Sequence, residues 1–101
     1  MKITIKGTKM ELTESIKDSV NEKIGSLQKF SDNITEAHVE VGKTSNHHQK
    51  GDVFFCEVNL KLPGKGIRAR EQKDDLYVAI NSAKEICQRE IKEYKEKMRN
   101  S

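Results

Sequence analysis

Lysine and arginine are the residues of this chain whose spacing points most clearly to a chemistry. Because a helix turns about 100° per residue, four bases near the C-terminus share one flank that carries no acid from position 84 onward: Lys84, Lys92, Lys95 and Arg99. The acids of this stretch lie on the rest of the circumference, beside Arg89 and Lys97: Glu85, Glu90, Glu93 and Glu96. A row of cations without intervening acids attracts phosphates. The alternative interpretation is a solvated helix face with i,i+4 ion pairs.

A second group of bases lies on predicted strands. Because side chains alternate along a strand, five bases point to the same face of a sheet: Lys2, Lys6, Lys61, Arg68 and Arg70. Three acids share that face: Glu36, Glu40 and Glu57. This face is a secondary candidate for contact with RNA, and the sign of its charge stays open.

The other reactive residue types form no known catalytic or metal-binding motif. Cys56 and Cys87 lie at apolar positions of two periodic segments, which is typical of buried thiols in a reducing compartment. His47 and His48 lie in a polar stretch and are more typical of a solvated loop than of a metal site. A helix N-terminus explains the acid pair at 74–75, and a tight turn explains the glycines of 63–66. We expect no catalytic residue, no metal and no cofactor.

Hydrophobic periodicity predicts the elements that position these bases. Alternation over residues 2–6 predicts a strand that Gly7 ends. The buried face of this strand carries Ile3 and Ile5. Thr13 is a good N-cap for an amphipathic helix over residues 14 to about 29. Its apolar residues recur at helical spacing: Ile16, Val20, Ile24 and Leu27.

Three strands and a long helix are predicted for the rest of the chain. The second strand buries Ala37, Val39 and Val41, and a mobile hairpin loop is expected over Thr44 to Asp52. The third strand buries alternate residues: Phe54, Cys56, Val58, Leu60 and Leu62. The fourth buries Ile67 and Ala69. Asp74 or Asp75 caps a helix that runs to about Met98. Its core seam comprises Leu76, Ile80, Ala83, Cys87, Ile91, Tyr94 and Met98.

The resulting order, β-α-β-β-β-α, predicts an α+β fold. Because each strand alternates, the four-stranded sheet should be mostly antiparallel, with both helices packed on one face. A chain of 101 residues closes one core, so residues 1–101 form a single domain. No apolar run is long enough to cross a membrane, and no secretory signal opens the chain, so we expect a cytoplasmic protein.

The composition bears on how RNA would be bound. The formal charge is only +3, from 19 Lys+Arg and 16 Asp+Glu, so the placement of the bases matters more than their sum. Aromatic residues make up 5% of the chain and Trp is absent, which argues against base-stacking platforms for single strands. Recognition of phosphates and shape is the better mode.

Five short segments together resemble the ribosome hibernation promoting factor family, also called ribosome-associated translation inhibitors. They are residues 1–7, the helix start at 11–13, the helix end at 27–30, the helix start at 75–80, and residues 88–97. The family fold is β-α-β-β-β-α, in agreement with the order above. The resemblance implies a non-enzymatic translation inhibitor that binds the small ribosomal subunit and its rRNA, where messenger and transfer RNA would lie. Such proteins silence and protect idle ribosomes in stress or stationary phase.

The resemblance also assigns residues. The family's basic positions on the last helix correspond to Arg89, Lys92, Lys95 and Lys97, and Lys29 matches a lysine near the end of the first helix. This chain departs from the family at three frequently basic positions: Ser26, Ile86 and Glu93. Long members add a C-terminal dimerising domain, and this chain resembles a short form without it. We therefore expect a monomer when free, with no membrane partner and no small-molecule substrate.

Two other functions are compatible with the residues. One is a protein-interaction module that recruits a partner through its open sheet face or an edge strand. The other is a general binder of structured RNA, although the double-stranded-RNA module has the order α-β-β-β-α, without the strand that precedes the first helix here.

Overall fold

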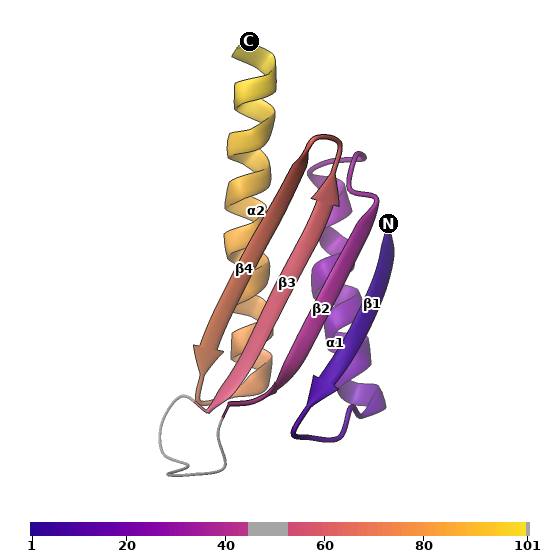
Figure 1. Ribbon diagram of the computed structural model, residues 1–101, viewed down its shortest axis with the longest axis vertical. Coiled ribbons are helices and arrows are strands. Elements are labelled where there is room, and N and C mark those ends of the chain that lie inside the picture. Colours follow the sequence, from indigo (N-terminus) through magenta and orange to yellow (C-terminus); the bar gives the residue numbers. More distant parts are fainter. Residues whose placement is uncertain (45–52, 101) are drawn as a thin grey trace.

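The computed structural model describes residues 1–44 and 53–100, which fold into four strands and two long helices (Figure 1). In chain order the elements are β1 (Lys2–Thr8), α1 (Glu14–Gly25), the 3-10 helix η1 (Ser26–Lys29), β2 (Glu36–Lys43), β3 (Phe54–Leu62), β4 (Lys65–Lys73) and α2 (Leu76–Asn100). The predicted order and α+β class are confirmed. The loop was predicted over Thr44 to Asp52, and its residues 45–52, with His47 and His48, lie outside the described residues.

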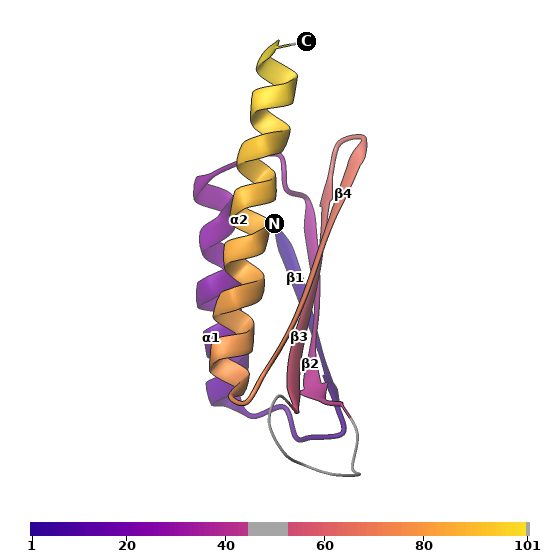
Figure 2. The same ribbon diagram turned by 90° about the vertical axis from the view of Figure 1, so that its left-hand side faces the viewer.

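The four strands form one sheet in the order β1-β2-β3-β4. The β2–β3 and β3–β4 pairs are antiparallel, whereas β1 pairs with β2 in parallel, so the sheet is mixed and mostly antiparallel as predicted. Both helices lie on the same side of the sheet (Figure 2), which leaves the other face uncovered. The fold therefore offers two surfaces for a partner: the outer side of the helices and the open sheet face.

The first helix begins as predicted but ends earlier. Thr13 caps α1 by accepting a hydrogen bond from the Ile16 amide at its hydroxyl oxygen, 3.2 Å away. The α-helix stops at Gly25, and the chain continues to Lys29 as a tighter 3-10 turn. Leu27 is nevertheless fully buried, because the tighter turn keeps its side chain directed at the core.

Strand β1 runs beyond its predicted end. Gly7 does not terminate it, because pairing with β2 continues to the register partners Thr8 and Gly42. Ile3 and Ile5 are only partly buried, since β1 is an edge strand. They pack against the margin of the hydrophobic core.

Asp75 caps the second long helix, α2, which extends beyond the end of the sheet. Asp75 Oδ1 accepts hydrogen bonds from the amides of Tyr77 (2.8 Å) and Val78 (3.2 Å). The predicted seam is buried as far as Ile91 and partly buried at Tyr94, whose hydroxyl donates to the Pro63 carbonyl oxygen (3.2 Å). The prediction is wrong for its last residue, Met98, which is 63% exposed. The helix extends past the β3–β4 turn there (Figure 1), so no strand lies beneath it.

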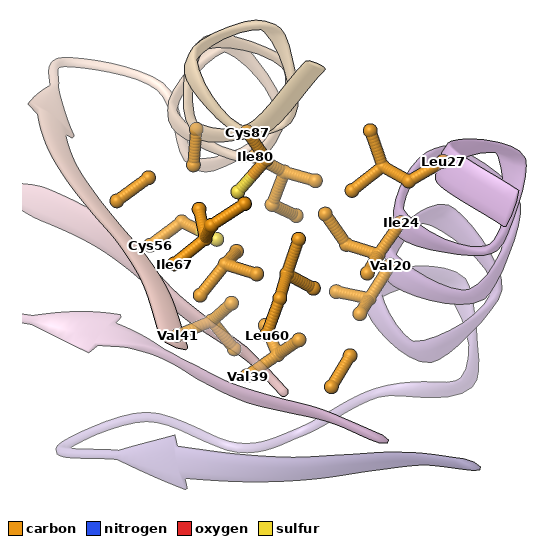
Figure 3. Packing of buried hydrophobic residues seen from close by; sticks show 14 of the residues in the cluster. Val20, Ile24, Leu27, Val39, Val41, Cys56, Leu60, Ile67, Ile80 and Cys87 are labelled. Carbon is orange, nitrogen blue, oxygen red and sulfur yellow. The ribbon is translucent and has the colours of Figure 1, made fainter. Parts of the chain in front are cut away.

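One hydrophobic cluster joins both helices to the inner face of the sheet (Figure 3). Cys56 of β3 and Cys87 of α2 are free, fully buried members of it, as predicted. Burial raises the pKa of each thiol to about 12, so both stay protonated and unreactive in the folded chain. Within the described residues, no helix is long and apolar enough to cross a membrane.

Candidate nucleic-acid interface

The acid-free flank of α2, here called the basic ridge (Lys84, Lys92, Lys95 and Arg99), meets the end of the first helical segment at Phe30. The ammonium group of Lys92 lies over the Phe30 ring, 5.4 Å from its centroid. Lys95 Nζ donates a 2.7 Å hydrogen bond to the Phe30 carbonyl oxygen. Two bases of the ridge are thus held against the turn that follows η1, and Lys92, Lys95 and Arg99 remain at least partly exposed.

Lys95 has a structural role in addition to any role in binding. Its ammonium group satisfies a carbonyl at the end of η1, where helical carbonyls lack intrahelical partners. We expect Lys95→Met to lower the free energy of unfolding by about 0.5–1.5 kcal/mol, because one charge-assisted hydrogen bond is removed while the apolar stem is kept. Urea unfolding would measure this change. An unaltered midpoint would show that the Phe30 contact adds nothing to stability.

Three shallow hollows follow the ridge. The first has a volume of about 460 Å³ and lies between the turn after η1 and the end of α2, lined by Ser31, Asp32, Asn33, Tyr94, Lys95, Met98 and Arg99. The second, about 230 Å³, is lined by Phe30, Lys92, Lys95, Glu96 and Arg99. The third, about 460 Å³, is lined by Lys84, Glu85, Gln88, Arg89 and Lys92. Basic side chains therefore line a row of concave surfaces along α2.

The remaining predicted bases are divided between two sides of α2. Arg89 lies beside the ridge, because it lines a hollow with Lys84 and Lys92. Lys97 lies toward β4, where it shares a hollow of about 230 Å³ with Lys65 and Arg68. Two acids line that hollow as well: Glu90 and Glu93. Lys29 ends η1 and is exposed next to Phe30, near the ridge.

The open sheet face carries bases along its outer strands and acids nearer its middle. In the register, Lys2 and Lys6 of β1 lie opposite Glu36 and Glu40 of β2, and Glu40 lies opposite Glu57 of β3. Lys61, which is also exposed, lies opposite Glu36 on the other side of β2. The predicted bases on this face are thus interleaved with carboxylates.

Glu57 partly neutralises the bases of β4. Its Oε1 accepts from Arg68 (2.9 Å) and from Arg70 (3.2 Å), and the hydrogen bond from Arg68 is the main cause that lowers the pKa of Glu57. Arg70 also lies over the ring of Phe55, 4.1 Å from its centroid, and Phe55 is only 3% exposed. A phosphate at this face would have to compete with Glu57 for both arginines, so the ridge on α2 is the stronger candidate.

The lowered pKa of Glu57 predicts a pH dependence of stability. Because the folded-state pKa lies below the unfolded value of about 4.3, Glu57 adds stability above that pH, and this is lost as pH falls through the folded pKa. At neutral pH we expect the free energy of unfolding of the wild type to be higher than that of Glu57→Gln. The difference should be less than about 1 kcal/mol, since both guanidinium groups are exposed. The difference should disappear as pH falls below about 4.3 and through the lower folded-state pKa. Thermal unfolding across this range would measure it, and a gap independent of pH would contradict the assignment.

The residues that the structure describes offer no evident place for a metal. None of them form a group of three or more His, Cys, Asp or Glu side chains that could hold an ion. The arrangement on α2 instead suits a polyanion, because exposed cations and concave surfaces lie together there.

Comparison with known proteins identifies the family of this chain. The model of the family described as Sigma 54 modulation protein / S30EA ribosomal protein matches residues 3–99. The chain belongs to this family. The predicted relationship to hibernation factors is confirmed by curated members of that name. The chain is 34% identical to the ribosome hibernation promotion factor of Deinococcus radiodurans over 90% of its own length, and 30% identical to the ribosome hibernation promoting factor of Pseudomonas putida over 99%.

The relatives differ in length, and a solved structure supports the family fold. The chain spans about half (47%) of the Deinococcus radiodurans protein, but 92% of the Pseudomonas putida protein. The crystal structure of the Thermus thermophilus Protein Y N-terminal domain matches with a TM-score of 0.81 and 28% identity. This match covers 93% of the present chain and 99% of that domain.

The structure also adds residues to the candidate interface that the sequence did not indicate. Phe30 anchors two lysines of the ridge, and Asp32, Asn33, Tyr94 and Met98 line the first hollow. Their signal in the sequence is weak, because polar turn residues and helix-seam residues occur in every fold of this type. Only the packing of α2 beside the turn after η1 brings them together.

Proposed function

We propose that this chain is a non-enzymatic translation inhibitor that binds the small ribosomal subunit in the channel used by messenger and transfer RNA. The observation that carries the proposal is the basic ridge of α2 in a member of this family. The names of the curated relatives, which are ribosome hibernation factors, support it. We expect the protein to act in the cytoplasm, on idle ribosomes in stress or stationary phase, and to be monomeric when free.

The mechanism is steric exclusion. A compact body in the decoding channel blocks messenger and transfer RNA without any bond-making step, so no active site is required. Lysine and arginine on α2 would contact rRNA phosphates, and these contacts displace condensed counterions. The ridge comprises Lys84, Lys92, Lys95 and Arg99; Arg89 lies beside it, and Lys29 and Lys97 would extend the contact at either side. The open sheet face, with Lys2, Lys6, Lys61, Arg68 and Arg70, is the secondary surface.

Co-sedimentation with purified small subunits at low and high potassium concentration tests the proposal, with an in vitro translation assay alongside. We expect binding that falls steeply with salt, and inhibition of translation at the concentrations that saturate binding. Salt-insensitive binding that survives nuclease treatment would instead support a protein-interaction module. If a plain RNA duplex competed as well as intact subunits, the protein would be a general binder of structured RNA.

A further inference from the structure

The first two hollows beside the ridge share a wall made of Lys95 and Arg99. The larger one lies on the side of the turn at 31–33, and the smaller one lies on the side of Lys92. Their linings differ in chemistry. The larger is lined by polar turn residues and by side chains with apolar surface, whereas the smaller is mostly cationic. Two adjoining compartments of this kind fit a ligand that has a flat polar ring and a negatively charged group.

We propose that the pair of hollows holds one nucleotide that is unstacked from RNA, with guanine preferred. The base would occupy the larger hollow and its phosphate the smaller one. The proposal deepens the function proposed above and rests on it, because it names the element of the RNA that this end of α2 contacts.

The larger hollow has the size and surface for a base. Its volume, about 460 Å³, lies within the range of roughly 300–1,000 Å³ typical of sites for small organic ligands. Tyr94 supplies an aromatic ring, and its hydroxyl is tied to the Pro63 carbonyl oxygen (3.2 Å), which restrains the side chain. Met98 supplies a polarisable thioether on a stretch of helix that is otherwise polar. A base loses little water-exposed surface on a flat charged helix, but it can stack against these two side chains.

The smaller hollow has the charge for a phosphate. Three bases, one acid and one aromatic residue line it: Lys92, Lys95, Arg99, Glu96 and Phe30. Lys95 Nζ donates to the Phe30 carbonyl oxygen at 2.7 Å, and an ammonium group has three donors, so two remain for a ligand. The same hydrogen bond restrains the position of the ammonium group, and little entropy is then lost when it binds an anion.

Asp32 determines both the orientation of the bound nucleotide and the preference for guanine. Asp32 lines the larger hollow and not the smaller one, so its negative charge disfavours a phosphate on that side and favours one beside Lys92. A carboxylate accepts hydrogen bonds and donates none. Guanine alone among the four bases presents two adjacent N–H donors, N1–H and N2–H, on its Watson–Crick edge, and these match the two oxygens of a carboxylate.

The test uses the full chain, labelled with ¹⁵N, and three single-stranded RNA pentamers that differ only in the central base: UUGUU, UUAUU and UUUUU. Amide signals are followed during titration at low salt. We expect the largest shifts at residues 31–33 and 94–99, and an affinity for UUGUU about tenfold above that for the other two pentamers. Asp32→Asn should remove this preference, because an amide replaces one acceptor with a donor. Asp18→Asn, which makes the same change on the exposed surface of α1, should leave the preference intact.

Equal affinities for the three pentamers, shifts confined to other parts of the chain, no binding, or a guanine preference that survives in Asp32→Asn would each overturn the proposal. None of these results would affect the proposed function, which co-sedimentation tests separately. If small subunits bind with the expected salt dependence while the pentamers show no preference, the nucleotide site is refuted and ribosome binding stands. If co-sedimentation fails while the guanine preference holds, the hollows bind a nucleotide in another RNA.

Discussion

Replacing Lys92 and Arg99 together by glutamate is expected to lower the affinity for small ribosomal subunits at least about 100-fold at low salt. Both side chains are exposed on the basic ridge, and both line the smaller hollow at Phe30. Each reversal removes a cation that would bind a phosphate and adds repulsion. Lys95 is left in place, because its hydrogen bond to the Phe30 carbonyl oxygen also holds the end of η1.

Co-sedimentation over a series of salt concentrations would measure this effect. The slope of log affinity against log salt should become shallower by about two, one for each phosphate that is no longer neutralised. A double variant on α1, Lys17→Glu with Lys23→Glu, changes the net charge equally at residues that line none of the three hollows along the ridge, so it should bind far better than the ridge variant. An equal fall in affinity for the two variants would show that net charge, and not the ridge, governs binding.

Gly42→Ala is expected to lower the free energy of unfolding by about 1–3 kcal/mol. Gly42 is buried at the end of β2, opposite Thr8 of the parallel strand β1. A Cβ atom at this position would lie 2.1 Å from the Thr8 carbonyl oxygen, which is backbone and cannot rotate away. The last part of β1 would have to move off β2, which would weaken hydrogen bonds and packing at the sheet edge.

Gly66→Ala provides a matched control for that substitution. Gly66 lies in β4 of the same sheet, but the nearest atom to an added Cβ is the Leu60 carbonyl oxygen at 3.9 Å, an ordinary contact. Urea unfolding of both variants should show a clear decrease in stability for Gly42→Ala and a change within about 0.5 kcal/mol for Gly66→Ala. Similar midpoints would mean that β1 is not held as closely to β2 as the register requires.

Most of the fold was predictable because its signals are local. Alternating apolar residues predicted all four strands, and helical spacing predicted both helices, with Thr13 as the cap of the first and Asp74 or Asp75 as the cap of the second. A side chain's preference for one face of an element depends only on the residues within that element. The errors lie at the ends of elements, at Gly7, Gly25 and Met98, where neighbours decide whether pairing, helical geometry or burial continues.

The candidate site, too, was predictable from the sequence only in part. The sequence alone determined that the bases of α2 are segregated from its acids, because the angle between residues on one helix is set by backbone geometry. It also determined the family, since several short segments occur together in the right order. The assignment of phosphate contacts to individual lysines stays a prediction for the binding experiments above.

Only the tertiary structure decided which of these bases face a concave surface and which are already paired. The sequence placed Arg68 and Arg70 on a face that they share with three acids, but only the structure shows that both bind Glu57, which lies on a neighbouring strand. Phe30 and Asp32 meet the end of α2 although about 60 residues separate them in the chain. Such contacts depend on the packing of helices and strands against one another, and this packing is a property of the whole core and not of any single segment.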